Sequence, residues 1–261
     1  TIEGHKACAA EMHDYFARYP SLSAQPETVM TIQLFDLTDA SQRIFFSPYC
    51  WRTRMALKHK GLAFESLPWH FTEGDRLAAS GGNRVPVIVD GDTCLGDSAE
   101  IAAYLDKTYP DAPALMADTA ARSRATFIDA WCNATVFAPL RPLAVHAVFK
   151  IIAEKDKAYF RESRERMLKT KLEELSSDPD AEAAALNKAL RPANEALAIA
   201  PFLAGAAPDY SDYILFGTLM WVYAVCPQNP IDMASPVGHW FGRVLDLHDG
   251  FARQAPTVRS A

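Results

Sequence analysis

The chain has 261 residues, of which 49% are hydrophobic, 22% charged and 11% aromatic, and its formal net charge is -6. This length fits one large domain or two small ones, and this composition can fill a core, which argues against disorder over most of the chain. The acidic balance argues against a nucleic-acid-binding protein, because phosphate contacts need a basic surface.

The cysteine and histidine patterns argue against a disulfide framework and a metal site. Five cysteines are spread widely along the chain with no CxxC pair, and the histidines form no HxxxH or HExxH pattern. No apolar run approaches the roughly 20 residues of a membrane span. We therefore expect a cytoplasmic protein without a bound metal. The five cysteines are Cys8, Cys50, Cys94, Cys132 and Cys226.

The first 30 residues carry no basic region followed by an apolar stretch, so they do not resemble a signal peptide. Met30 directly precedes a strong strand pattern that begins at Thr31. We expect residues 1–30 to be an extension outside the compact fold, native or artificially added.

Residues 31–109 alternate strand and helix patterns. Strands are predicted over 31–37 and 64–68, with a helix between them that starts after Ser47 at Pro48 and ends before Gly61. The Asp-Gly pair at 90–91 predicts a hairpin between strands over 85–89 and 93–95. A capping box over 97–100 predicts a closing helix. This order predicts a small mixed sheet with helices packed on it.

The remainder of the chain is predicted to be helical. Residues 110–116, with two prolines, are expected to form a linker to an all-helical domain over 117–261. Helices are predicted over 209–225 and 236–251, and Pro192 is expected to interrupt a helical stretch over 181–200.

Three features of the first domain point to chemistry only when they are taken together. Ser47 opens a helix, where free N–H groups and the helix dipole favour an anion such as a thiolate; alternatively, Ser47 only caps the helix. Val85 before Pro86 would present its backbone to an extended peptide if their bond is cis, but Pro86 also fits an ordinary edge strand. Asp97 and Ser98 expose helix N–H groups for a ligand carboxylate, although capping explains them equally well.

With this order of strands and helices, the three features resemble those of a cytosolic glutathione transferase. The resemblance covers Thr31 to about Phe251 and implies a thioredoxin-like α/β N-terminal domain followed by an all-α C-terminal domain. It implies glutathione as co-substrate and a two-fold homodimer. Residues 202–205 and 209–212 resemble the capping motif that precedes a buried helix in this family.

The resemblance implies a role for the residues of these three features. Ser47 stands at the catalytic position, Val85 and Pro86 at the cis-proline loop, and Asp97 and Ser98 at the γ-glutamyl-binding pair. Arg84, beside that loop, could meet a peptide carbonyl or carboxylate, although an exposed strand-end arginine is equally ordinary.

Residues 47–61 and 240–250 are also similar to the bacterial β-etherase-like branch and to related fungal transferases. This similarity implies attack of a glutathione thiolate on a hydrophobic aromatic electrophile, including cleavage of β-aryl ethers. Ser47 would donate a hydrogen bond to the sulfur. Serine cannot form a mixed disulfide, so exchange through position 47 is excluded, and Cys50 is expected to be a small buried residue.

Two further groups of residues have both an ordinary and a functional interpretation. Five aromatic residues are candidate walls for the co-substrate, although a core position is the simpler interpretation of each. Four basic residues on the helix that starts at Pro48 are expected to form a solvated face: Arg52, Arg54, Lys58 and Lys60. A protein that only binds glutathione and aromatic ligands, and a glutathione-dependent isomerase or lyase, are the alternatives to a transferase. The aromatic candidates are Phe45, Phe46, Trp131, Phe137 and Tyr223.

Overall fold

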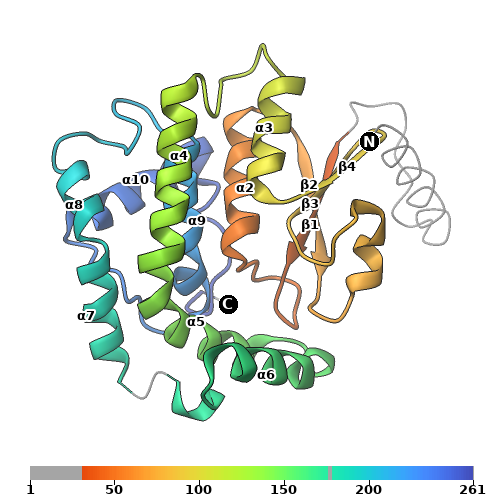
Figure 1. The fold of residues 1–261 in the computed structure, drawn as a ribbon, viewed down its shortest axis with the longest axis vertical. Helices are drawn as coiled ribbons and strands as arrows, with labels where there is room; N and C mark the ends of the chain where they lie inside the picture. The colour runs from red at the N-terminus through yellow and green to blue at the C-terminus, as the bar shows by residue number, and fades with distance from the viewer. Residues whose placement is uncertain (1–30, 176–177, 261) are drawn as a thin grey trace.

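A computed structural model describes residues 31–175 and 178–260 (Figure 1). The expectation for residues 1–30 lies outside this range. The described chain forms a four-stranded mixed sheet with helices packed on it, followed by a helical region, which confirms the predicted thioredoxin-like and all-helical architecture.

The sheet has the strand order β2-β1-β3-β4. β1 runs parallel to β2 and antiparallel to β3, and β3 and β4 form the predicted hairpin around Gly91, whose φ is +56°. The strands are β1 (Ile32–Leu37), β2 (Phe64–Trp69), β3 (Val87–Asp90) and β4 (Thr93–Gly96).

Two helices cover one face of this sheet. α2 (Pro48–His59) crosses from β1 to β2, and α3 (Ser98–Thr108) follows β4. Figure 1 shows both helices between the sheet and the helical region. Leu34 and Ile88 of the sheet and Met55 and Leu105 of the helices are fully buried between them. A 3₁₀ helix, η2 (Gly74–Ser80), lies in the segment between β2 and β3, for which we predicted no element.

The helical region follows a segment without helix or strand between Thr108 and Thr119. Pro192 stands at the start of a new helix, as expected, because its ring fits the first turn. The helices are α4 (Thr119–Trp131), the π turn η3 (Cys132–Val136), α5 (Phe137–Ile151), α6 (Glu154–Leu168), the 3₁₀ turn η4 (Leu172–Glu174), α7 (Pro179–Ala189), α8 (Arg191–Leu197), α9 (Tyr210–Val225) and α10 (Pro236–Gly250).

Helix α9 is the centre of this region and packs against α2, α4 and α5. Its first turn is closed by the predicted capping box of Asp209 and Asp212. Asp212 also accepts hydrogen bonds from the backbone N–H of Leu203 at 2.8 Å and from the indole N–H of Trp240 at 2.8 Å. The capping motif therefore ties the preceding loop and α10 to the central helix.

Two sequence expectations need correction. The predicted continuous helix over 236–251 is broken near its end, where His248 and Asp249 have φ of 53° and 60°. Polar residues tolerate this left-handed backbone better than most. The predicted basic face is not solvated, because Arg52 and Arg54 of α2 and Lys60 directly after it are 3%, 8% and 4% exposed, and Lys58 is half-buried.

The helical stretch from Thr119 to Ile151 is long and apolar enough, by length and composition alone, to cross a membrane. We did not predict such a stretch, because no uninterrupted apolar run in the sequence approaches that length. It comprises α4, the π turn and α5, contains charged residues such as Asp129 and Arg141, and packs against α9 and α7. We therefore attribute its apolar character to its place in the helical core.

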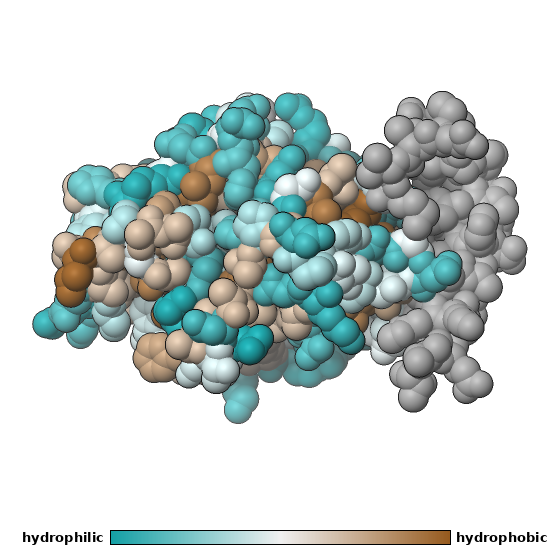
Figure 2. All heavy atoms as spheres, turned by 90° about the horizontal axis from the view of Figure 1, so that it is seen from above, coloured by the Kyte–Doolittle hydropathy of each residue, from teal (hydrophilic) through white to brown (hydrophobic). Residues whose placement is uncertain are grey.

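The outer face seen from above Figure 1 mixes hydrophilic and apolar residues without a broad apolar area among the atoms in colour (Figure 2). Of the large apolar side chains that the described chain exposes, Tyr49, Tyr159 and Met167 line one cavity. That cavity also contains Ser47.

Candidate active site

Ser47 lies at the N-terminus of α2, beside a cavity between the sheet domain and the helical region. Its backbone is extended, Pro48 occupies the first turn, and its Oγ accepts a hydrogen bond from the N–H of Cys50 at 3.3 Å. Ser47 is only 4% exposed but lines the cavity. The first turn of α2 has no acidic residue, so the helix dipole and the serine hydroxyl both favour an anion here.

Cys50, one turn further along α2, is fully buried, as expected. Burial raises the pKa of its thiol well above the usual range, and the carboxylate of Asp36 raises it further. The thiol therefore stays protonated near neutral pH and is a poor nucleophile.

The loop before β3 faces the same cavity. The peptide bond between Val85 and Pro86 is cis, and Arg84 and Val85 line the cavity together with Ser47. Pairing of β3 with its neighbours begins at Val87, so Val85 lies outside the paired residues of the sheet.

Asp97 and Ser98 lie at the start of α3 and are not among the residues that line the cavity. The Asp97 carboxylate accepts hydrogen bonds from the N–H groups of Ala99 at 2.8 Å and Glu100 at 3.3 Å. The carbonyl of Ser98, a buried residue, accepts a hydrogen bond from the Tyr210 hydroxyl at 2.6 Å. These contacts fix the N-terminus of α3 against α9.

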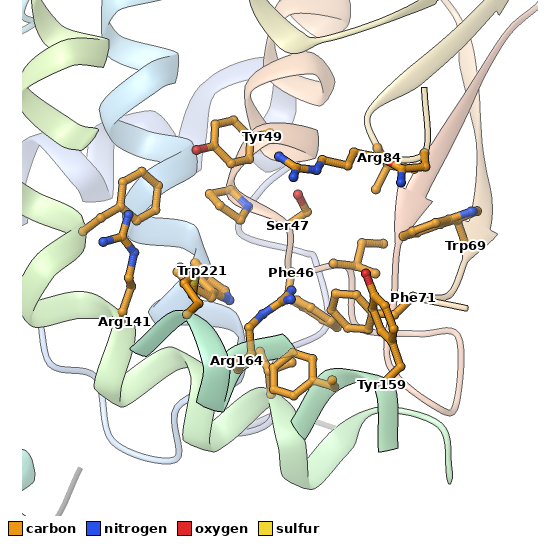
Figure 3. Close-up of a pocket in the computed structure, with 18 residues that line it drawn as sticks. Phe46, Ser47, Tyr49, Trp69, Phe71, Arg84, Arg141, Tyr159, Arg164 and Trp221 are labelled. Atoms are coloured by element: carbon orange, nitrogen blue, oxygen red, sulfur yellow. The ribbon is translucent and has the colours of Figure 1, made fainter. Parts of the chain in front are cut away.

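The cavity has a volume of about 350 Å³, and Figure 3 shows the side chains around it. Its walls come from the start of α2, the end of β2, the loop before β3, and helices α5, α6 and α9. A larger cavity of about 570 Å³ lies beside α5 and α7 and contains none of the predicted site residues. The aromatic lining residues of the first cavity are Phe46, Tyr49, Trp69, Phe71, Phe137, Tyr159, Phe160 and Trp221.

Two of the five aromatic residues singled out from the sequence, Phe46 and Phe137, line this cavity, and the other three do not. Phe45 lies under the guanidinium of Arg54, and Tyr223 packs against Phe241 and under Arg259. Trp131 ends α4 and packs against the core.

Sequence reasoning missed most of the cavity wall from the helical region. Arg141 of α5, Tyr159 and Arg164 of α6, and Trp221 of α9 all line it. No local motif marks these residues. They meet only because three helices pack beside the N-terminus of α2 (Figure 3).

The cavity is cationic. Arg84, Arg141 and Arg164 line it, and no aspartate or glutamate of the described chain does. In Figure 3 the side chain of Arg84 extends toward Ser47. Within residues 31–175 and 178–260, no group of three or more potential ligands from His, Cys, Asp and Glu is placed to hold a metal ion.

Two family models match this chain. Residues 44–113 match the family model "Glutathione S-transferase, N-terminal domain", and residues 124–249 match "Glutathione S-transferase, C-terminal domain". A solved glutathione S-transferase of Ceriporiopsis subvermispora, in complex with glutathione, superposes with a TM-score of 0.75. It is 26% identical and covers 86% of this chain and 100% of that chain.

Curated relatives match over shorter segments. Glutathione S-transferase Z1 of Arabidopsis thaliana is 33% identical over 109 residues, which are 40% of this chain and 48% of that relative. A probable maleylacetoacetate isomerase of Vibrio cholerae is 38% identical over 82 residues, which are 29% of this chain and 38% of that relative. The chain thus spans about half or less of the length of these curated relatives.

Proposed function

Because the chain belongs to the cytosolic glutathione transferase superfamily, we propose that it binds glutathione beside Ser47 and Val85 and transfers the glutathione sulfur to a hydrophobic aromatic electrophile. The observation that carries this proposal is the position of Ser47. Its hydroxyl lies at an anion-favouring helix N-terminus and lines an aromatic cavity.

The chemistry begins with ionisation of the thiol. A free thiol has a pKa of about 8.5, so only about 3% is thiolate at pH 7. A lowering of about two units, which helix N-termini and hydrogen-bond donors achieve, would ionise most of the bound thiol. Ser47 donates its hydroxyl proton in a hydrogen bond to the sulfur and keeps that proton, while the thiol proton leaves to solvent.

The thiolate then attacks an electrophilic carbon of the co-substrate. A carbon–sulfur bond forms, the bond from that carbon to oxygen or halogen breaks, and an aryloxide or halide leaves with the electron pair. Phe46 and Phe137 would contact the aromatic ring. Cys50 stays protonated and takes no part, so the reaction is a transfer and not a thiol–disulfide exchange.

The rest of glutathione would extend along the edge of the sheet domain. The backbone N–H and C=O of Val85, next to Pro86, would pair with the peptide. Arg84 would meet a carbonyl or carboxylate, and Asp97 and Ser98 would hold the γ-glutamyl end. We further propose that two copies of the chain form a two-fold dimer.

A glutathione-dependent isomerase is the second candidate, and the similarity to the isomerase of Vibrio cholerae favours it. The same thiolate would add to a double bond and be expelled again, so no leaving group is released. Product analysis separates the candidates: a transferase yields a stable thioether, an isomerase returns free glutathione, and β-aryl ether cleavage releases a phenol.

The test compares two serine variants. Ser47 and Ser235 both cap a helix whose next residue is proline, but Ser235 caps α10 and does not line the cavity. We expect Ser47→Ala to lower kcat/KM for glutathione conjugation of chlorodinitrobenzene by about 100-fold while calorimetry still detects glutathione binding. Ser235→Ala should retain the activity. Equal activity in the wild type and both variants would show that Ser47 only caps α2. Glutathione binding without turnover in the wild type would show that the protein binds glutathione but is not a transferase.

A further inference from the structure

The three cavity arginines have no acidic partner in the described chain. Arg84 comes from the loop before β3, Arg141 from α5 and Arg164 from α6, and each lines the cavity. Arg84 is exposed and Arg141 and Arg164 are half-buried, whereas the buried Arg52 has a carboxylate partner, Asp129, at 2.6 Å. Cations that converge on a cavity without carboxylates favour an anionic ligand.

Helix α6 provides an internal comparison. Its two other central arginines, Arg161 and Arg166, each pair with glutamate side chains outside the cavity. Within residues 31–175 and 178–260, Arg164 has no carboxylate partner, and its guanidinium donates a hydrogen bond to the Ser163 hydroxyl at 2.9 Å. On the same helix, the guanidinium that faces the cavity is the one left without a carboxylate.

Arg164 is also held in place by aromatic rings. Its guanidinium carbon lies 4.7 Å from the ring centre of Phe160 and 5.3 Å from that of Phe71. Figure 3 shows it extending from α6 toward the space beneath Ser47, near Tyr159. Stacking fixes the planar group with little loss of further freedom when it binds a carboxylate.

The surroundings of Arg164 are poorly hydrated and positive. Burial lowers the pKa of Arg164 and outweighs the opposing effect of Tyr159, and the positive charge of Arg84 makes a smaller contribution that also lowers it. Two cations that repel one another across one cavity would both be stabilised by an anion between them.

Glutathione, in its proposed position, uses Arg84 and the edge of the sheet domain, which leaves the cations of the helical region for the co-substrate. We propose that the electrophile is an aromatic compound with a carboxylate, and that Arg164 binds this carboxylate while the thiolate beside Ser47 attacks the ring. Arg164 thereby determines specificity. This inference rests on the proposed function.

The experiment uses two matched probes, chlorodinitrobenzoate and its methyl ester. With either probe, the glutathione thiolate forms a carbon–sulfur bond at the ring carbon that bears chlorine, and chloride leaves with the electron pair. The probes share ring and leaving group and differ in the negative charge. Each enzymatic kcat/KM is divided by the uncatalysed rate with glutathione to remove intrinsic reactivity.

We expect the wild type to prefer the acid and Arg164→Gln to lower kcat/KM for the acid by about 10- to 100-fold, as for loss of a hydrogen bond between charged groups. The value for the ester should change by less than about threefold, and KM for glutathione should stay constant. Arg164→Lys should recover part of the preference. Arg166→Gln, on the same helix but outside the cavity, should change neither probe.

The failures are distinguishable. Equal loss on both probes would make Arg164 a structural residue, and a raised KM for glutathione would assign it to glutathione; either result overturns the inference. If the wild type turns over the ester in a Ser47-dependent way but does not prefer the acid, the inference is overturned and the proposed function stays intact. If neither probe reacts, or if Ser47→Ala reacts as fast as the wild type, the proposed function fails and the inference with it.

Discussion

Helix α2 has a closed body and an open beginning. In the body, Arg54 lies 2.7 Å from the fully buried Asp36, and Arg52 pairs with Asp129 of α4. At the beginning, Ser47 faces a cavity whose arginines have no carboxylate in the described chain. The arginines in the body of α2 are therefore paired with carboxylates, whereas the arginines of the cavity at its beginning are not, among the described residues. The comparison suggests that substitutions in the body chiefly alter stability and those at the beginning chiefly alter activity.

The largest expected effect comes from breaking the buried charge pair of the body. Asp36→Asn removes the carboxylate beside Arg54, which is 8% exposed and enclosed by the rings of Phe45, Trp51 and Phe251. Loss of one partner of a buried pair leaves an uncompensated charge, so we expect the free energy of unfolding to fall by about 3–5 kcal/mol. Urea denaturation measures it.

Asp246→Asn is the matched control, because Asp246 pairs with Arg253 on the surface of α10, where both side chains are about half exposed. Exposed pairs contribute about 0–1 kcal/mol. Similar losses in the two variants would contradict the distinction between a structural, buried pair and a surface pair.

This contrast also explains what the sequence could predict. Local signals placed α2 and the hairpin correctly, because Pro48 and the Asp-Gly pair at 90–91 restrict or favour particular backbone dihedral angles where they stand. The same local reasoning expected a solvated basic face on α2. It was wrong for Arg52 and Arg54, because their partners, Asp129 and Asp36, lie on other elements.

The candidate site divides in the same way. Ser47 and Val85 belong to short local motifs, and the structure brings them to one cavity. Arg141, Arg164 and Trp221 belong to helices over 50 residues further along the chain, and no local pattern predicts that these helices line the same cavity as Ser47. The break at His248 was missed because the helical pattern continues through it.

A second prediction tests whether the beginning of α2 depends on close packing. A Cβ atom at Gly217 of α9 would lie 2.4 Å from the carbonyl oxygen of Pro48 and 2.9 Å from Cγ of Arg52. Gly217→Ala must therefore push α2 away from α9 beside Ser47. We expect a loss of about 1–3 kcal/mol in the free energy of unfolding, as for overpacked cores, together with reduced kcat/KM.

Gly242→Ala in α10 is its control, since the nearest atom to the added Cβ, on Arg253, is 4.0 Å away. An alanine in an uncrowded helix gains about 0.5–1 kcal/mol over glycine. Equal stability changes of the two variants would show that α9 does not hold α2 by close approach.

The smallest expected effect concerns the other end of α2, which is closed by hydrogen bonds. Nε2 of His59 lies 3.2 Å from the carbonyl oxygen of Ala114, so this nitrogen carries the proton, and Nδ1 accepts from the Tyr213 hydroxyl at 2.8 Å. The Tyr213 oxygen in turn lies 3.5 Å from Nε2 of His248. With Nδ1 as the acceptor, His59 is neutral.

Protonation should therefore weaken this end. Burial lowers the pKa of His59, and the positive charge of Lys60 lowers it further, despite the opposing effect of the Ala114 carbonyl. Burial likewise lowers the pKa of His248. A histidine with a lowered pKa contributes stability above its unfolded pKa of about 6.5, and this contribution is lost as the pH falls through the folded value. Stability of the wild type should thus fall between pH 7 and pH 5.

Tyr213→Phe isolates the contribution of these bonds, because it removes the hydroxyl that is hydrogen-bonded to Nδ1 of His59. We expect a loss of about 1 kcal/mol in the free energy of unfolding at pH 7, with a smaller further decline toward pH 5 than in the wild type. Urea denaturation at pH 7 and pH 5 measures both the loss at pH 7 and the further decline. Since this end lies away from the cavity, kcat/KM at pH 7 should change little, and a large loss of activity with intact stability would show that the two ends of α2 are not independent.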